Sequence, residues 1–114
     1  MSDLTIDAIS AALRGLSMRQ QVIAQNLANS ETPGYTAGVV SFEDQLRDAI
    51  KAGTPRSITP TVAASSAAAK IDGNNVALDD ETVALVETGL RYQLMSQAAT
   101  NKFNIIRAAI GRGV

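Results

Sequence analysis

The sequence predicts a mainly α-helical fold, with long amphipathic helices at its N- and C-terminal ends packed as a coiled-coil-like pair. Hydrophobic residues recur at steps of three and four near both ends of the chain, which is the spacing of a helix face. Aromatic residues make up only 4% of the 114 residues, and Trp is absent. Aromatic side chains supply much of the buried area in compact cores, so this composition favours thin helix-to-helix seams within a single domain, residues 1–114.

The N-terminal helix is predicted over residues 3–29, where hydrophobic side chains follow heptad spacing. Gln20 occupies the one polar position of this seam, where it either sets the register or lies at a solvated edge. A stripe this narrow leaves an isolated helix marginally stable, so the helix needs a partner. The predicted seam residues are Ile6, Ile9, Leu13, Leu16, Ile23 and Leu27.

Residues 30–40 are predicted to form a turn that ends the first helix. Pro33 disfavours the helical conformation for the residue before it. Pro33 and Gly34 are the pair that a type II turn prefers at its two central positions, and the second of these positions needs a positive φ. We therefore expect a sharp stop, with Gly34 in the left-handed region.

The middle of the chain predicts a short helix and then an irregular segment. The short helix is expected over residues 41–53, with Ser41 as N-cap, Asp44 at the capping-box position and Gly53 as C-cap. Residues 54–78 are rich in Ala, Ser and Pro and are predicted to be a flexible or partner-dependent linker that ends in a turn. An extended piece within residues 56–62 is the alternative. The apolar face of the short helix consists of Phe42, Leu46, Ala49 and Ile50.

The C-terminal helix is predicted over residues 79–110, with Asp79 or Asp80 as its cap and with Gly111 and Gly113 ending it. Gly89 lies within the hydrophobic stripe, where we expect it to permit the close approach of a neighbour. The seam residues of this helix are Leu85, Tyr92, Met95, Phe103, Ile106 and Ile110.

The sequence offers little that supports catalysis or ligand binding. It has no Cys and no His, hence no disulfide, no thiolate zinc site and no imidazole base. The acids at residues 79–81 are explained by helix capping rather than by a metal. A calcium loop starting at Asp72 fails, because Ala77 and Val83 stand where Gly and Glu are required. We expect no enzymatic activity, no cofactor and no small-molecule substrate.

Nucleic-acid binding and signal-peptide secretion are not expected either. Residues 20–29 could open a helix-turn-helix, but residues 36–40 contain no Lys or Arg to meet phosphates or bases. The formal net charge is −1, without a basic cluster. An acidic Asp3 stands where a secretory signal needs a positive region, and no apolar run approaches the roughly 18 residues that span a bilayer.

The segment at the predicted turn resembles the N-terminal signature of the bacterial flagellar axial proteins, the rod and hook family. Further along, Asp72-Gly73-Asn74-Asn75-Val76 and Leu90-Arg91-Tyr92-Gln93 are most similar to the proximal-rod branch of that family, the FlgB-like proteins. Phe42 and Leu46, soon after the signature, agree with this. The resemblance leaves out residues 53–70. The residues that match the signature are Asn26, Ala28, Asn29, Thr32, Pro33, Gly34 and Tyr35.

The resemblance implies a structural subunit of the flagellar basal-body rod. It implies export by the flagellar type III apparatus and assembly on the membrane-embedded base and export gate. The implied partners are other rod subunits, including FlgC-like proteins, further copies of this chain and the adaptor FliE. The signature residues would fix the exit from the first helix and present the next segment to a neighbour, although Tyr35 is equally well explained as an ordinary turn aromatic. The alternatives are a FlgC-like rod protein and, with less support, a helix-turn-helix protein.

Substitution of Gly34 tests the predicted turn. Gly34→Val should strain the backbone by about 1–3 kcal/mol, because a β-branched residue fits a positive φ poorly. We expect this variant to be made and exported but to join the rod poorly, which leaves cells with few filaments. Gly34→Asn should be milder, because Asn tolerates the left-handed region. Equal and normal amounts of both variants in purified basal bodies would show that this turn does not guide assembly.

Overall fold

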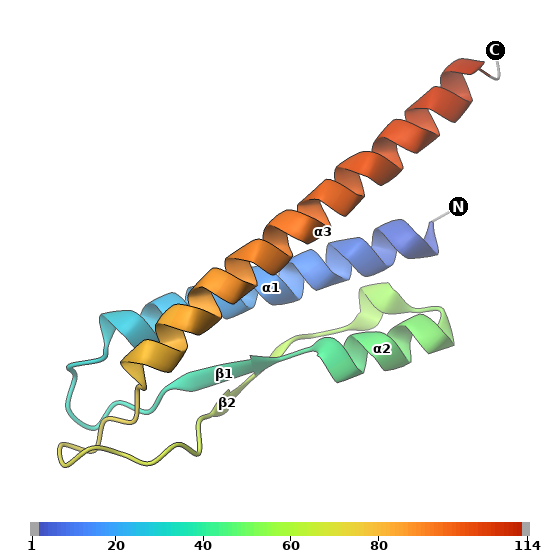
Figure 1. Ribbon diagram of the computed structural model, residues 1–114. Coiled ribbons are helices and arrows are strands. Elements are labelled where there is room, and N and C mark those ends of the chain that lie inside the picture. Colours follow the sequence, from blue (N-terminus) through green and yellow to red (C-terminus); the bar gives the residue numbers. More distant parts are fainter. Residues whose placement is uncertain (1–2, 113–114) are drawn as a thin grey trace.

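The computed structural model describes residues 3–112, which form an elongated and mainly helical molecule (Figure 1). Its extents are 67 × 26 × 14 Å and its radius of gyration is 17.9 Å, against about 13 Å for a compact domain of this length. The elements, in chain order, are α1 (Leu4–Ala28), β1 (Gly38–Ser41), α2 (Glu43–Ala52), the single 3₁₀ turn η1 (Pro55–Ser57), β2 (Thr61–Ala64) and α3 (Leu78–Arg112).

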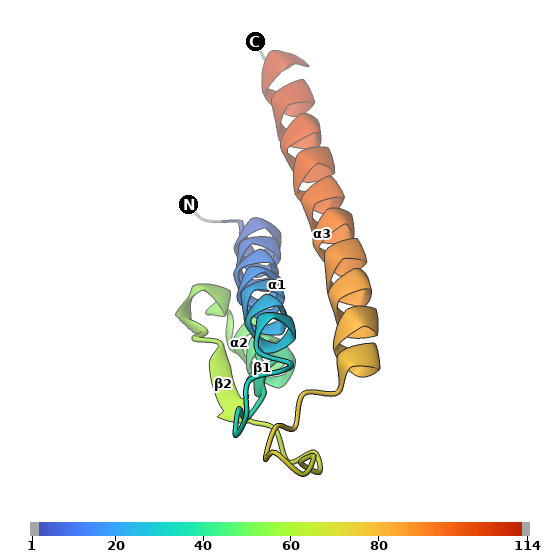
Figure 2. The ribbon, with the colours of Figure 1, turned by 90° about the vertical axis from the view of Figure 1, so that its left-hand side faces the viewer.

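The two terminal helices pack side by side in opposite directions, which confirms the predicted fold class at this level (Figures 1 and 2). Asp3 caps α1 by accepting hydrogen bonds from the backbone N–H groups of Thr5 and Ile6, at 2.8 and 3.3 Å. The other carboxylate oxygen of Asp3 lies 3.4 Å from Nζ of Lys102 in α3. The remaining residues of α3 extend beyond the N-terminus of α1 (Figure 1).

α1 forms the middle layer of the molecule, between α3 on one side and the strands, α2 and η1 on the other (Figure 2). Gly15 allows the second contact, because a Cβ at this position would stand 2.5 Å from ring atoms of Phe42. The guanidinium of Arg19 lies 4.9 Å from the centre of the same ring. The buried hydrophobic core of this side consists of Ala11, Leu16, Val40, Phe42, Ala49 and Ile58.

The middle segment has definite structure. β1 and β2 pair antiparallel, with Gly38 opposite Ala64 and Ser41 opposite Thr61. Val40 of β1 is buried towards α1, whereas every residue of β2 is exposed. The extended alternative for residues 56–62 is thus confirmed only in part, because residues 55–57 form η1 and the strand begins at Thr61. β1 was not predicted, because a four-residue strand is too short to display a convincing alternation.

Several predicted helix ends differ from the structure. Ser41 belongs to β1 and does not cap α2; Phe42 holds that position without a side-chain hydrogen bond, and the Arg19–Glu43 ion pair anchors the first turn. The C-cap prediction is confirmed, since Gly53 has φ +77° and its N–H donates to the carbonyls of Ala49 and Ile50.

α3 begins one residue earlier than predicted, at Leu78, so Asp79 and Asp80 lie in its first turn and neither is the cap. Acidic side chains in this turn still stabilise the helix, because they lie near the positive end of its dipole. Gly111 lies inside α3 and does not end it, because a helix tolerates Gly near its end at a cost of about 1 kcal/mol. Gly113 lies outside the described residues.

The Arg19–Glu43 pair should make stability depend on pH. Two hydrogen bonds of 2.5 and 2.7 Å from Arg19 lower the pKa of Glu43 from 4.5 to about 2. A lowered carboxyl pKa stabilises the fold above the unfolded-state pKa, and the effect is lost as the pH falls through the folded-state pKa. The Glu43 side chain is 46% exposed, so we expect Glu43→Gln to lower the free energy of unfolding by only about 1 kcal/mol at pH 7.

Urea unfolding of both proteins between pH 7 and pH 2 measures this difference. It should be constant above about pH 5 and shrink towards pH 2. The matched control is Asp44→Asn in the same turn, whose ion pair with Arg47 is largely exposed and should contribute less than about 0.5 kcal/mol. A pH-independent difference for Glu43→Gln would contradict the assignment.

Candidate functional site

The signature segment begins in the last turn of α1, and Asn29 forms the C-cap that ends the helix. Asn29 is the C-cap residue, and its side-chain Nδ2 donates to the carbonyl of Gln25 at 2.9 Å. Its Oδ1 accepts from the hydroxyl of Thr32 at 3.1 Å. The side chain therefore satisfies a carbonyl of the last turn and holds the chain that leaves it.

A β-turn from Thr32 to Tyr35 follows, closed by a 3.2 Å hydrogen bond from the N–H of Tyr35 to the carbonyl of Thr32. Gly34 occupies the third position with φ +74°, so the predicted positive φ is confirmed. No heavy atom lies within 4 Å of the place that a Cβ on Gly34 would occupy. A larger residue there would thus be disfavoured by backbone conformation and not by crowding within this chain.

Asn26 is fully buried and joins three parts of the fold. Its Nδ2 donates to the carbonyl of Gly38 at 2.9 Å, and its Oδ1 accepts from the N–H of Gly38 at 3.0 Å, so the amide pairs with both backbone groups of one residue. Nδ2 also donates to Glu81 of α3 at 3.1 Å, and the hydroxyl of Tyr35 donates to Oδ1 at 3.4 Å. One side chain thereby connects α1 with the start of β1 and the first turn of α3.

Asn74 and Asn75 perform the same task from the opposite loop. The buried Nδ2 of Asn74 donates to the carbonyls of Asn29 and Thr32, both at 2.8 Å. Oδ1 of Asn75 accepts from the N–H of Ala37 at 2.7 Å, and its Nδ2 donates to carbonyls in the stretch after β2. The two amides therefore tie the segment before α3 to the segment after α1.

The two loops also touch through their backbones. The N–H of Gly34 donates to the carbonyl of Asp72 at 2.8 Å. Gly73, with φ +85°, comes so close that a Cβ on it would lie 3.3 Å from Cα of Gly34. We call residues 29–38 and 65–76 together the loop clamp. Within the described part of the chain, every buried side-chain nitrogen and oxygen has a hydrogen-bond partner, and this includes the buried amides of the clamp.

The other signature residues are placed at the surface of the clamp. Thr32, Pro33 and Gly34 are exposed, Ala28 is exposed at the last helical position of α1, and Tyr35 is half-buried. The structure thus brings Asn26 and Tyr35 together in hydrogen-bond contact and leaves the side chains of the turn exposed, while its backbone is bound to the opposite loop.

Of the predicted seam residues, Ile6, Ile9, Leu13 and Phe103 line the space between α1 and α3, whereas Leu16 is buried in the core on the α2 side. Gln20 faces Gly89, where its Nε2 lies 3.7 Å from the place a Cβ would occupy. Phe103 and Ile110 are 52% and 65% exposed. Leu16 and Ile23 are buried, and the half-buried seam residues are Ile6, Ile9, Leu13, Leu27, Leu85, Tyr92, Met95 and Ile106.

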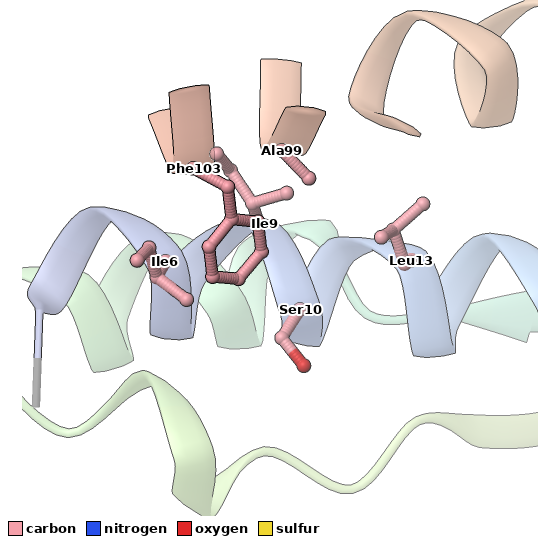
Figure 3. Close-up of a pocket in the computed structure, with 6 residues that line it drawn as sticks. All are labelled: Ile6, Ile9, Ser10, Leu13, Ala99 and Phe103. Atoms are coloured by element: carbon pink, nitrogen blue, oxygen red, sulfur yellow. The ribbon is translucent and has the colours of Figure 1, made fainter. Parts of the chain in front are cut away.

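The two helices diverge towards the N-terminus of α1 and leave an open apolar groove of about 210 Å³ between them (Figure 3). Hydrophobic side chains from both helices point into it, and the hydroxyl of Ser10 is the one polar side-chain group of its lining. The lining residues are Ile6, Ile9, Ser10, Leu13, Ala99 and Phe103. Such a surface suits a hydrophobic side chain of another protein better than a polar substrate.

Nothing in the described part of the chain resembles a reaction centre. Residues 3–112 hold no cluster of three or more acidic side chains positioned to bind a metal ion. None of the helices described is both long and apolar enough to cross a membrane.

Sequence reasoning missed Gly15, Gly38 and the clamp role of Asn74 and Asn75. Residues 72–75 were interpreted as a turn from their composition, and this is correct for the backbone. The composition does not indicate which groups the side-chain amides of Asn74 and Asn75 bind. Two adjacent Asn after Asp-Gly were a usable signal, since one Asn suffices for a turn. Gly38 accompanied by Val39 and Val40 also marked a place where a strand begins at a close backbone contact.

Comparison with known proteins agrees with the resemblance at the turn. Residues 7–36, which include most of α1 and the Thr32–Tyr35 turn, match the family described as "Flagella basal body rod protein". The flagellar basal body rod protein FlgB of Bacillus subtilis is 30% identical over 122 residues, covering 96% of this chain and 95% of the relative. FlgB of Escherichia coli is 28% identical over 127 residues, covering 85% and 91%. FlgB of Borreliella burgdorferi is 28% identical over 128 residues, covering 93% and 95%.

Substitution of Asn26 should weaken the clamp far more than substitution of Asn29. Asn26→Ala leaves both backbone groups of Gly38 without a partner, which should lower the free energy of unfolding by about 2–3 kcal/mol. Asn29→Ala removes hydrogen bonds at an exposed site and should cost less than about 1 kcal/mol. Urea unfolding followed by circular dichroism measures both values. Equal losses of unfolding free energy in the two variants would mean that the buried amide of Asn26 does not contribute more than the exposed side chain of Asn29.

Proposed function

Because this chain belongs to the family of flagellar basal-body rod proteins to which FlgB belongs, we propose that it builds the proximal part of the rod, as a segment of the flagellar drive shaft. Family membership places it in the basal body as a structural rod subunit that assembles with other rod subunits. The proximal position and the torque-bearing role are the proposed steps. They are supported by relatives that are all FlgB proteins and are matched over most of their length.

The uncovered hydrophobic surface of the terminal helices is the observation that carries this proposal. Ile110 continues the α3 seam beyond the end of α1, Phe103 lines the groove beside the first turns of α1, and both are more than half exposed. A lone folded protein gains nothing from such residues, but a subunit can bury them against neighbours. A rod also needs elongated subunits that overlap along an axis, and the 67 Å length of this molecule meets that need.

We further propose that the chain reaches the rod through the flagellar type III export apparatus. A narrow export path requires a chain that unfolds easily. This chain has no cysteine to form a disulfide, and its core is thin and poor in aromatic side chains. Its proposed neighbours are FlgC-like subunits, the adaptor FliE and the membrane-embedded base with its export gate.

The signature residues have a structural role in this proposal. Asn26, Asn29 and the Pro33–Gly34 turn fix the path from α1 to β1, and the loop clamp holds that path against the start of α3. The exposed turn then lies at one end of the molecule, ready to contact a subunit further along the rod. In this proposal, the hydrogen bonds of the site fix the positions of α1, β1 and the start of α3 relative to one another, and they have no chemical reaction to perform.

Complementation of a strain that lacks its FlgB protein tests the rod role. The wild-type chain should restore swarming and be found in purified basal bodies. Leu13→Asp and Ile106→Asp should each abolish both, because a carboxylate in an apolar helix contact costs several kcal/mol. Gln21→Asp and Gln97→Asp, at exposed positions of the same helices, serve as controls and should complement. Full swarming with both seam variants would contradict assembly through the terminal helices.

A further inference from the structure

β2 is the outer strand of the two-stranded sheet, on the side away from α1 and α3 (Figure 1). The N–H of Ser65 donates to the carbonyl of Ala37 at 2.8 Å, and this pair keeps the register of the sheet. In an antiparallel ladder the bonded pairs recur at every second residue. The polar backbone groups of Ala63 therefore point towards β1, whereas those of Val62 and Ala64 point away from it.

The opposite edge of the sheet agrees with this alternation. By the same rule, the polar backbone groups of Gly38 and Val40 in β1 point away from β2. The amide of Asn26 binds both groups of Gly38, and the guanidinium of Arg19 donates to the carbonyl of Val40 at 2.9 Å. Side chains of α1 thus close one edge of the sheet.

The edge formed by Val62 and Ala64 has no such cover. Every residue of β2 is exposed, and among residues 3–112 no hydrogen bond from another segment reaches the outward groups of these two residues. Proteins protect open edges with charged side chains, proline or a bulge. β2 reads Thr-Val-Ala-Ala and pairs with β1 over four successive residues. Its two outward N–H and two outward C=O groups are therefore available to a further strand.

The length of this edge decides how a partner can be held. Four residues of strand span about 13 Å, so pairing along them buries much less than the roughly 1,200 Å² that a stable interface between two free proteins needs. A strand this short is held when other contacts already keep its protein nearby, because the effective concentration is then of the order of millimolar. Neighbours in a rod meet that condition.

A second copy of this chain does not supply the strand. Within the described residues its strands are β1, whose edge α1 closes, and β2 itself. Joining the same edge of two copies requires a twofold axis, whereas copies that follow one another along a shaft are related head to tail. Residues 65–70 are not a free strand either, because Asn75 binds the carbonyls of Ser65 and Ala67.

We propose that the outer edge of β2 accepts an extended segment of a different rod protein as a third strand. The segment is uncharged, because the side chains of β2 offer no charge to pair with. Val62 is 54% exposed and favours a β-branched or aromatic residue beside it. The inference rests on the proposed rod function and deepens it, by naming a surface outside the terminal helices through which the chain meets an unlike neighbour.

Proline substitution tests the free edge. Val62→Pro removes an N–H that points outward, so pairing with β1 should persist, as it does at the edge positions where proline occurs in proteins. The urea midpoint should therefore stay close to that of the wild type. In cells that make both chains at equal levels, the ratio of variant to wild type in purified basal bodies should fall at least about tenfold, which is the effect of one lost hydrogen bond on binding.

Two further variants are the controls. Val62→Thr keeps the outward N–H and a β-branched side chain, so it should enter basal bodies as the wild type does. Ala63→Pro removes an N–H that points towards β1 and should lower the urea midpoint. A midpoint lowered equally by Val62→Pro and Ala63→Pro would overturn the assignment of the free edge. Equal incorporation of Val62→Pro and the wild type would overturn the added strand.

Hydrogen exchange provides a readout without substitution. In the free chain, the amides of Val62 and Ala64 should exchange at nearly the rate of an unprotected amide, because their N–H groups face solvent. In purified basal bodies both should exchange at least about tenfold more slowly. Unchanged exchange of these two amides in basal bodies would overturn the proposal.

A single cysteine distinguishes an unlike neighbour from a copy, since the wild-type chain contains no Cys. If two β2 strands paired with Val62 of each opposite Ala64 of the other, the two Ala63 residues would face each other at a distance that a disulfide can bridge. Ala63→Cys should therefore give no linked dimer in mildly oxidised basal bodies, and such a dimer would overturn the choice of an unlike partner. The rod function is judged separately, by whether the wild-type chain complements the strain that lacks its FlgB protein.

Discussion

The pairing between the buried amide of Asn26 and the backbone of Gly38 holds the rest of the structure in place. It fixes where β1 begins relative to α1, and the same amide reaches Glu81 at the start of α3. Because both polar groups of Gly38 are satisfied there, the strand can lie directly on the helix without losing hydrogen bonds. The direction of α2 and the pairing of β2 with β1 then follow from that placement.

Two kinds of contact, on different sides of α1, stabilise the fold. On the side of α2 and the strands, the Phe42 ring packs against Gly15, with Arg19 above it, within a cluster of buried side chains. On the α3 side the helices meet along a long contact that opens into the groove near the N-terminus of α1. The protein is therefore well specified where its own elements meet and incompletely covered where we place its neighbours.

The sequence predicted the features that depend on local spacing. Heptad periodicity located both terminal helices, and the Pro33–Gly34 pair located the turn and the positive φ of Gly34. Gly53 was found as a C-cap for the same reason, since a left-handed cap has a local signature. Ser41 was misjudged as an N-cap because strand pairing with Thr61, a contact twenty residues away, determines its conformation.

Features fixed by contacts between distant residues could not be predicted. Nothing near Asn26 in the sequence indicates that it will face Glu81, and nothing near Gly15 indicates an aromatic ring. The clamp roles of Asn74 and Asn75 depend on where the chain returns after β2, which only the assembled fold determines. The motif residues were identified through resemblance, whereas their physical task became visible through their hydrogen bonds.

The position of α1 as the middle layer has a mechanical consequence. The α3 layer and the layer of α2, η1 and the strands pack mainly on α1 and little on one another. The 25-residue helix α1 is therefore the packing surface that both layers share. A force that draws the chain from its N-terminus removes this support first, and each outer layer then loses its main packing surface at once. If neighbours bind α3 in the rod, as we propose, we expect the molecule to resist load along its length, and we expect it to unfold more easily when it is pulled from the end that carries α1.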